Sequence, residues 1–276
     1  MPSFETSDGL SLYYTDDGQG QPVLCLPGLT RNHRDFDPVM PHLSDVRVIR
    51  LDARGRGGSA YDPNHANYNL HRETLDVIEL LDHLSLPDTT ILGTSRGGLA
   101  AMLLAMLAPE RLRGAILNDV GPEIASDGLT RIMDYVGITP KSANYDDAAA
   151  AMKHVFGAHF PDVSLAFWRE QAAAQYEETP QGLRLRYDPQ LRQALLDQAS
   201  AGPTPDLWPL FDAVADRPLG LIRGANSDLL SEGTAAEMQR RAPHMHFANI
   251  PNRAHVPFLN EAGSLDVIGA VLKDTA

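Results

Sequence analysis

The feature that most constrains the fold is an alternation between short β-rich runs and longer stretches with helical periodicity. Strands are expected near residues 4–7, 10–15, 23–26, 46–51, 89–93, 115–117, 219–222 and 246–250. Helices are expected near residues 36–43, 73–84, 99–108, 231–241 and 264–273. Such alternation is typical of βαβ units, in which helices connect parallel strands and cover the sheet. The first two runs are also compatible with an antiparallel hairpin.

The alternation is interrupted once, between about residues 121 and 209, where helical patterns replace the β-rich runs. In residues 146–160 and 164–176, apolar side chains recur at the spacing that places them on one face of a helix. We therefore expect a core domain formed by residues 1–120 and 210–276, with residues 121–209 inserted as a helical segment.

Composition excludes several classes of partner. The chain has 23 Lys plus Arg against 36 Asp plus Glu, a net charge of −13, so nucleic acid and anionic membranes would repel it. Its longest apolar stretch, residues 99–108, is too short to span a bilayer, which takes about 20 residues. Cys25 is the single cysteine and is expected to be a buried small hydrophobe. With no secretory pattern in the first residues, we expect a cytoplasmic protein.

A candidate nucleophile lies at the junction of an expected strand and an expected buried helix. Residues 93–97 read Gly-Thr-Ser-Arg-Gly, a Gly-x-Ser-x-Gly pattern. The bare pattern is weak evidence, since it arises by chance in on the order of one chain in ten of this length. A nucleophile elbow, however, requires this strand-turn-helix context together with glycines beside the serine. We therefore expect Ser95 to be a nucleophile; the alternative is that it only caps the helix.

A serine nucleophile requires a histidine base, and the histidine requires a carboxylate. His255 follows the last expected strand, in a loop from which it could reach Ser95. Asp228 follows the preceding expected strand and is the expected acid, with an ordinary turn aspartate as the alternative. Asp119, at the end of an earlier expected strand, is the rival acid and ranks behind Asp228.

An oxyanion hole needs two backbone N–H groups, one from the residue after the nucleophile and one from the loop that follows the third strand. The candidates are the amides of Arg96 and Leu29. Gly28 is expected to permit the backbone conformation that turns the amide of Leu29 inward. The alternative is an ordinary Pro-Gly turn at the end of the strand.

No metal or organic cofactor is expected. His244 and His246 share one face of an expected strand, but neither a His-Glu-x-x-His motif nor a cysteine cluster accompanies them, and a structural role is favoured. The glycine-rich run at residues 52–59 lacks the Gly-Lys-Ser/Thr ending of a phosphate-binding loop. It is expected to be a structural loop.

Taken together, these residues resemble the α/β-hydrolase family over nearly the whole chain. The resemblance is carried, in the family's order, by Leu-Pro-Gly at 26–28, Asp-x-Arg-Gly-x-Gly-x-Ser at 52–59, the elbow at 93–97, Asp228 and His255. It implies an α/β-hydrolase fold, with a mostly parallel eight-stranded sheet flanked by helices and residues 121–209 as a helical cap over the active site. The chain looks most like the capped bacterial branch that contains carboxylesterases, enol-lactonases and cofactor-free haloperoxidase-like perhydrolases.

Two positions depart from the patterns of many relatives. Pro27 stands where histidine is common, which leaves the backbone hole intact, and Arg96 stands where methionine or glutamine often follows the nucleophile. We expect the Arg96 side chain to pair with a nearby carboxylate as part of the structure. A serine at position 95 disfavours haloalkane dehalogenases and epoxide hydrolases, which use an aspartate nucleophile in this fold.

The expected function is hydrolysis of a carboxylic ester or lactone in a small, partly apolar substrate. Ser95 would attack, His255 would act as base and then as acid, and Asp228 would orient the imidazole. The alternatives are C–C bond hydrolysis or perhydrolysis by the same triad, and ligand binding without catalysis on this scaffold. The side chains expected to line an acyl pocket are Phe156, Trp168 and Tyr176, although packing of cap on core explains them equally well.

Overall fold

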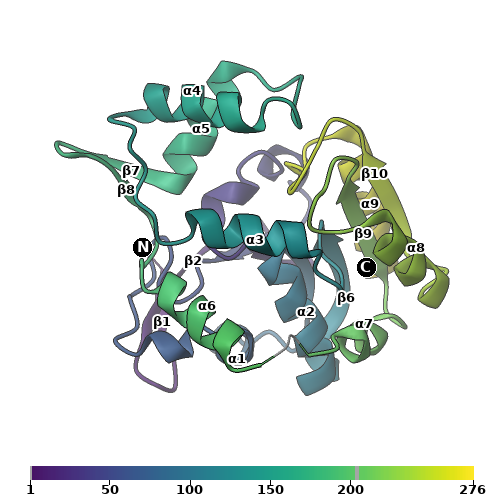
Figure 1. The fold of residues 1–276 in the computed structure, drawn as a ribbon. Coiled ribbons are helices and arrows are strands. Elements are labelled where there is room, and N and C mark those ends of the chain that lie inside the picture. The colour runs from purple at the N-terminus through teal and green to yellow at the C-terminus, as the bar shows by residue number, and fades with distance from the viewer. Residues whose placement is uncertain (1, 203–204) are drawn as a thin grey trace.

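The computed structural model describes residues 2–202 and 205–276, which form a mostly parallel eight-stranded sheet flanked by helices (Figure 1). The sheet has the order β1-β2-β4-β3-β5-β6-β9-β10. The pairs β1/β2 and β2/β4 are antiparallel, and the other pairs are parallel. The strands are β1 (Ser3–Glu5), β2 (Ser11–Asp17), β3 (Pro22–Leu26), β4 (Arg47–Leu51), β5 (Thr89–Thr94), β6 (Leu112–Asn118), β9 (Leu219–Gly224) and β10 (His246–Ile250). The sheet expected from the sequence, including its antiparallel first pair, is confirmed.

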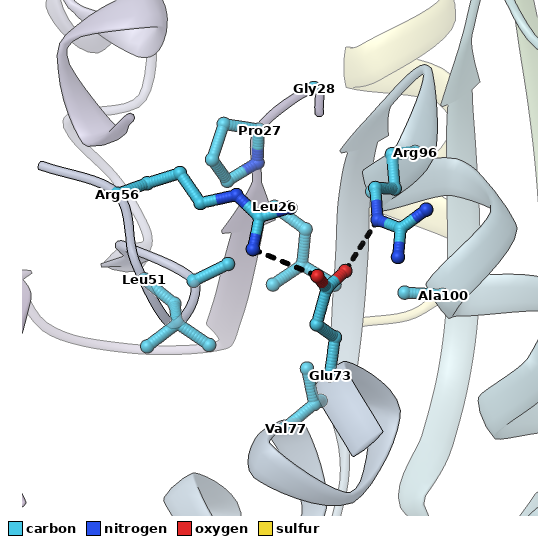
Figure 2. Close-up of a pocket in the computed structure, with 11 residues that line it drawn as sticks. Leu26, Pro27, Gly28, Leu51, Arg56, Glu73, Val77, Arg96 and Ala100 are labelled. Carbon is cyan, nitrogen blue, oxygen red and sulfur yellow. Dashed lines mark hydrogen bonds and ion pairs between the residues drawn. The ribbon is translucent and has the colours of Figure 1, made fainter. Parts of the chain in front are cut away.

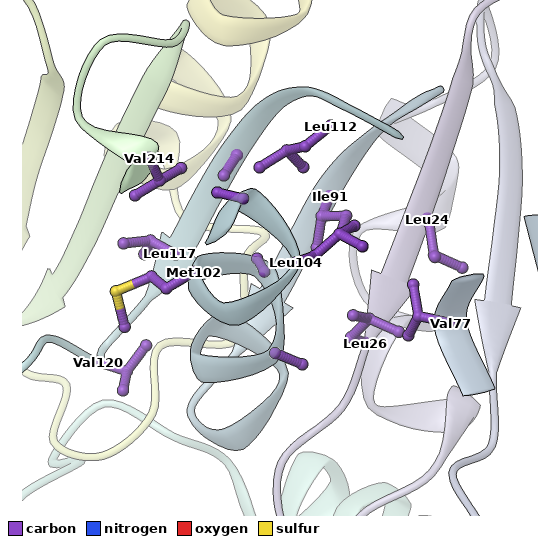
Figure 3. Packing of buried hydrophobic residues seen from close by; sticks show 14 of the residues in the cluster. Leu24, Leu26, Val77, Ile91, Met102, Leu104, Leu112, Leu117, Val120 and Val214 are labelled. Carbon is purple, nitrogen blue, oxygen red and sulfur yellow. The ribbon is translucent and has the colours of Figure 1, made fainter. Parts of the chain in front are cut away.

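Alternating residues of the central strands supply two separate apolar layers. Leu24 and Leu26 of β3 belong to the layer that packs against α1, α2, α7 and α8, whereas Val23 and Cys25 belong to the layer beneath α9. Figure 3 shows α2 at the centre of the first layer. The flanking helices are α1 (Leu70–His83), α2 (Arg96–Leu107), α7 (Trp208–Val214), α8 (Glu232–Arg241) and α9 (Ala262–Asp274). Cys25 is fully buried, as expected from its apolar neighbours.

Short 3-10 turns complete the core. The helix expected near residues 36–43 is instead two separate turns, η1 (His33–Phe36) and η2 (Met40–His42), and two more turns are η3 (His65–Asn67) and η4 (Pro109–Arg111). Pro41 stands within η2, and it has no N–H with which to continue a helical hydrogen-bond ladder.

Within residues 2–202 and 205–276, no helix is both long enough and apolar enough to cross a membrane.

The sequence predicts a helical segment between β6 and β9, and the structure has helices there together with a β-hairpin that was not expected. It contains α3 (Ser126–Tyr135), α4 (Tyr145–Phe156), α5 (Leu165–Gln175) and α6 (Leu191–Ser200), together with an antiparallel hairpin of β7 (Tyr176–Thr179) and β8 (Gly182–Leu185). Gly182 has a φ of +109°, which only glycine adopts readily, so the two residues between the strands form a tight turn. Figure 1 shows α4 and α5 beside each other and apart from α1 and α2.

Several groups of contacts attach this inserted segment to the core. Just after the hairpin in the sequence, Asp188 makes one group of these contacts. The Tyr68 hydroxyl donates to Asp188 at 2.6 Å, and the Asp188 amide donates to the Gly55 carbonyl at 2.8 Å. At the other side, Phe160 lies 5.4 Å from Phe258, measured between ring centroids. Phe258 follows His255 by three residues, so the segment packs directly against the loop that carries this histidine.

Candidate active site

The turn between β5 and α2 has the geometry that a nucleophile elbow needs. Ser95 has φ +51° and ψ −115°, a conformation that non-glycine residues rarely adopt. A Cβ atom at Gly93 would lie 2.6 Å from the backbone of Gly97, and one at Gly97 would lie 2.0 Å from the carbonyl oxygen of Leu26. Both glycines are therefore required for α2 to approach β5 and β3 this closely. The expected strand-turn-helix context of Ser95 is confirmed.

Ser95, His255 and Asp119 form one continuous chain of hydrogen bonds. His255 Nε2 lies 3.0 Å from Ser95 Oγ, and His255 Nδ1 lies 2.8 Å from Asp119 Oδ2. A proton on Nδ1 donated to the carboxylate leaves Nε2 free to accept the serine hydroxyl proton. The arrangement thus contains a hydroxyl, a base and a carboxylate in the order that nucleophilic catalysis requires.

Asp119 is held rigidly at the end of β6. It is fully buried, has a φ of +55° and directly follows the last residue of the strand. Its Oδ1 accepts a hydrogen bond from the Gly224 amide at 2.8 Å, and its Oδ2 accepts one from the Ser227 hydroxyl at 2.7 Å. Oδ1 therefore has a fixed donor from the last residue of β9, and Oδ2 has one from the turn after β9 in addition to His255.

The prediction that Asp228 contacts His255 is wrong. Asp228 Oδ2 instead forms an ion pair with Arg131 of α3 at 3.0 Å. The difference has a local cause, because the Ser227 hydroxyl turns toward Asp119 and accepts the Leu230 amide at 3.1 Å. Asp228 lies four residues beyond the end of β9, on the outside of this turn. Asp119, the rival carboxylate, occupies the place beside the imidazole.

The two expected oxyanion donors belong to the residue after the nucleophile and to the loop that follows β3. Arg96 is the first residue of α2, where helix amides have no acceptor within the helix. Within the part of the chain that the structure describes, the amides of Leu29 and Arg96 donate to no backbone or side-chain acceptor. Gly28 is not among the glycines with a positive φ. A Cβ at Gly28 would lie 3.7 Å from Ser95 Cβ, so this loop passes beside the nucleophile.

The side chain of Arg96 turns away to an ion pair, as expected from the sequence. Its Nε donates to Glu73 Oε2 of α1 at 2.5 Å, and the same carboxylate meets Arg56 Nη1 at 2.8 Å (Figure 2). Glu73 and Arg56 are both buried. No sequence signal points to Glu73 as this carboxylate, because it lies more than twenty residues from Arg96 and carries no motif.

Of the residues expected to line an acyl pocket, Phe156 and Trp168 pack beside the His255 loop. Their rings stack with centroids 6.1 Å apart, and Trp168 meets Phe258 edge-on at 6.3 Å. Trp168 is 3% exposed and belongs to the same apolar cluster as Phe160 and Ala254. Tyr176, at the start of β7, packs on different apolar groups, and burial raises the pKa of its phenol.

The two histidines considered as a metal pair have separate partners. His244 Nε2 lies 2.9 Å from the carbonyl oxygen of Arg217, and His246 Nε2 lies 2.8 Å from Asp274. Among the described residues, no group of three or more His, Cys, Asp and Glu side chains is placed to hold a metal ion. The glycine-rich run at residues 52–59 is a structural loop in which the buried Asp52 accepts the amides of His33 and Gly58.

Comparison with known proteins agrees with the fold. The family model described as alpha/beta hydrolase fold matches residues 21–262. The chain belongs to this family. Nine helices accompany the sheet in the described residues, and the strand order places the elbow near its middle.

Among its relatives in this family, the 3-hydroxybutyrate-oligomer hydrolase of Cupriavidus necator is 35% identical over 254 residues, which cover 88% of this chain and 85% of that protein. The 3-oxoadipate enol-lactonase 2 of Acinetobacter baylyi is 35% identical over 152 residues, covering 51% of this chain and 56% of that protein. A crystal structure of an alpha/beta hydrolase from Novosphingobium aromaticivorans superposes with a TM-score of 0.93 at 37% identity, covering 99% of this chain and 97% of that one. These relationships identify the chain as an alpha/beta hydrolase.

Proposed function

We propose that this alpha/beta hydrolase cleaves carboxylic esters or lactones through a triad of Ser95, His255 and Asp119. The observation that carries the proposal is the pair of contacts at 3.0 Å and 2.8 Å that link the serine hydroxyl, the imidazole and a fully buried carboxylate. An unactivated serine hydroxyl is a poor nucleophile, and this arrangement supplies the base and the orienting group that it needs.

In the first half of the reaction, Ser95 Oγ bonds to the carbonyl carbon while its proton passes to His255 Nε2. The carbonyl π electrons move to oxygen, and the resulting oxyanion accepts hydrogen bonds from the amides of Leu29 and Arg96. When the carbon–oxygen single bond to the leaving group breaks, the protonated His255 donates its proton to the departing alkoxide. An acyl group is then esterified to Ser95.

In the second half, a water molecule gives its proton to His255 and bonds to the acyl carbon. The tetrahedral intermediate collapses by breaking the bond to Ser95 Oγ, which regains a proton from His255. The acid product leaves and the enzyme returns to its starting state. Asp119 remains a carboxylate throughout and stabilises the imidazolium form of His255 in both halves.

We propose esters of short hydroxy acids as the first substrate class to test. The relative from Cupriavidus necator is named for hydrolysis of 3-hydroxybutyrate oligomers, and the similarity extends over most of both chains. The relative from Acinetobacter baylyi is named as an enol-lactonase, which supports including lactones. Both classes place an ester carbonyl at the reacting centre.

The test compares initial rates of the wild type and Ser95→Ala on p-nitrophenyl esters from acetate to decanoate, on 3-hydroxybutyrate dimer and trimer, and on several lactones. A fluorophosphonate probe reports separately whether Ser95 is an activated nucleophile. We expect turnover and labelling in the wild type, and loss of both in a folded Ser95→Ala variant. Turnover that survives this substitution refutes the nucleophile. Labelling of Ser95 without ester or lactone turnover refutes the substrate class and favours C–C bond hydrolysis or perhydrolysis.

A further inference from the structure

We propose that Glu73 is a positioning residue that fixes both backbone donors of the oxyanion hole by bridging Arg56 and Arg96. The inference rests on the proposed function and deepens it. It starts from Figure 2, in which the Glu73 carboxylate, extending from α1, lies between two guanidinium groups that come from different parts of the chain.

On one side, the bridge reaches the loop that carries Leu29. Arg56 Nε donates to the carbonyl oxygen of Leu29 at 2.8 Å, and Arg56 Nη1 contacts Glu73 Oε1 at 2.8 Å. Arg56 is 1% exposed, so its guanidinium cannot exchange these partners for water. The two peptide planes that flank Leu29 meet at its Cα, and holding its carbonyl restrains the direction of its amide N–H.

On the other side, the bridge reaches the residue after the nucleophile. Glu73 Oε2 accepts from Arg96 Nε at 2.5 Å, and the Arg96 amide is the second expected donor to the oxyanion. Arg96 also opens α2, so its side chain ties the start of this helix to α1. A single carboxylate thereby links the backbone elements that supply both donors.

The bridge is ionised and buried. Burial raises the pKa of Glu73, but the charges of Arg56 and Arg96 outweigh burial, and its pKa lies below the usual range. The group carries two positive charges and one negative charge, and it borders a cavity of about 30 Å³ that is also lined by Pro27, Gly28 and Gly97. Buried ion pairs often add little net stability, whereas they do fix geometry.

The net charge of these three side chains lets the direction of the change in kcat distinguish positioning from simple electrostatics. Removing the negative charge of Glu73 leaves more positive charge near the oxyanion, which by simple electrostatics would favour the transition state. If Glu73 acts by positioning, the same substitution slows the reaction. An oxyanion-hole donor is worth about 10²- to 10³-fold in kcat, and a misplacement of about 1 Å costs about 10²-fold.

Asp76 provides a matched control on the same helix, one turn after Glu73. It is 1% exposed and bridges two arginines, contacting Arg54 at 2.7 Å and Arg72 at 2.7 Å. It has no contact with Arg56 or Arg96 among the interactions of the described residues. Asp76→Asn therefore reproduces the loss of a buried bridging carboxylate without touching the oxyanion donors.

The experiment measures kcat and KM for the wild type, Glu73→Gln and Asp76→Asn on the best ester, with thermal denaturation as a check of folding. We expect Glu73→Gln to lower kcat about 10- to 100-fold with KM within about twofold. We expect affinity for a trifluoromethyl ketone, which forms an oxyanion on Ser95, to fall by a similar factor. Asp76→Asn is expected to keep kcat within about threefold of the wild type. A kcat for Glu73→Gln that equals or exceeds the wild type, or an equal loss in Asp76→Asn, overturns the proposal.

If Glu73→Gln fails to fold, Arg96→Met is measured in its place. This variant loses the ion pair with Glu73 but keeps the contact between Glu73 and Arg56 and the backbone amide at position 96. We expect it to lower kcat with little change in KM, and an unchanged kcat overturns the proposal. Ser95→Ala is measured beside it to separate the two levels of inference. Absence of Ser95-dependent turnover in the wild type refutes the proposed function. Ser95-dependent turnover that these variants leave intact refutes only the role of Glu73.

Discussion

The chain places an aspartate after β6 and another after β9, and the two have opposite surroundings. Asp119 is fully buried and accepts hydrogen bonds from Gly224 and Ser227 besides contacting His255. The Asp228 side chain is 21% exposed and pairs with Arg131, whose side chain is 47% exposed. The difference teaches that the sheet fixes the position of the first residue after a strand, whereas the turn decides where a residue four positions beyond the strand end points.

Asp119→Asn tests this comparison with the largest expected effect. An asparagine keeps the shape of the side chain but can donate to Nδ1, which would leave His255 in the tautomer that cannot accept the Ser95 proton. We expect kcat to fall about 10³- to 10⁴-fold with little change in KM, measured on the best ester found for the wild type. A near-normal kcat in a folded Asp119→Asn variant would remove Asp119 from the triad.

Much of the core was predictable because its signals are local. The β-rich runs, the elbow around Ser95 and the position of His255 after a strand can all be read from neighbouring residues. The acid could not be chosen in this way, because both aspartates follow strands. The choice depends on the sheet order, which puts β6 between β5 and β9, and on the turn at Ser227.

The hairpin of the inserted segment and the identity of the carboxylate that pairs with Arg96 were less predictable, for a related reason. The hairpin of β7 and β8 has only four residues in each strand, too few for a clear alternating pattern. Glu73 reads as a polar position of an ordinary amphipathic helix until α1 is packed beside α2. Tertiary packing therefore determined both features, and local sequence signals did not.

Gly224→Ala tests whether the end of β9 must approach the His255 loop closely. A Cβ there would lie 2.5 Å from the carbonyl oxygen of Ala254 and 2.6 Å from that of Arg253. Relief of these contacts would move the Gly224 amide that donates to Asp119. We expect a loss of about 1–3 kcal/mol in the free energy of unfolding, with a lower kcat, measured by chemical denaturation and ester hydrolysis. Wild-type stability would show that the strand end can shift freely.

Gly233→Ala is the control for that substitution. Gly233 lies in α8, and a Cβ there would approach Ser231 Oγ only at an ordinary distance of 3.7 Å. Alanine is also favoured over glycine in a helix. We expect this variant to be at least as stable as the wild type and to keep its kcat.

Ser227→Ala removes one side-chain donor to Asp119 while leaving the triad atoms in place. The Ser227 hydroxyl donates to Asp119 Oδ2 at 2.7 Å and also accepts the Leu230 amide at 3.1 Å. A hydrogen bond of this kind contributes about 1 kcal/mol, so we expect kcat to fall about fivefold. The measurement is kcat beside that of Ser227→Thr, which retains the hydroxyl and is expected to lose less. Equal losses in the two variants would assign the effect to packing.

Asp228→Asn is expected to have the smallest effect of the series. Its partner Arg131 is nearly half exposed, and an ion pair of this kind contributes about 0–1 kcal/mol. We expect kcat to stay within about threefold of the wild type. The double variant Asp119→Asn/Asp228→Asn sharpens the comparison, since independent sites combine additively. If Asp228 can swing to His255 when Asp119 is disabled, the double variant will lose activity that Asp119→Asn retains. If the two regions are as separate as their contacts indicate, the double variant will match Asp119→Asn in kcat to within the small effect of Asp228→Asn alone.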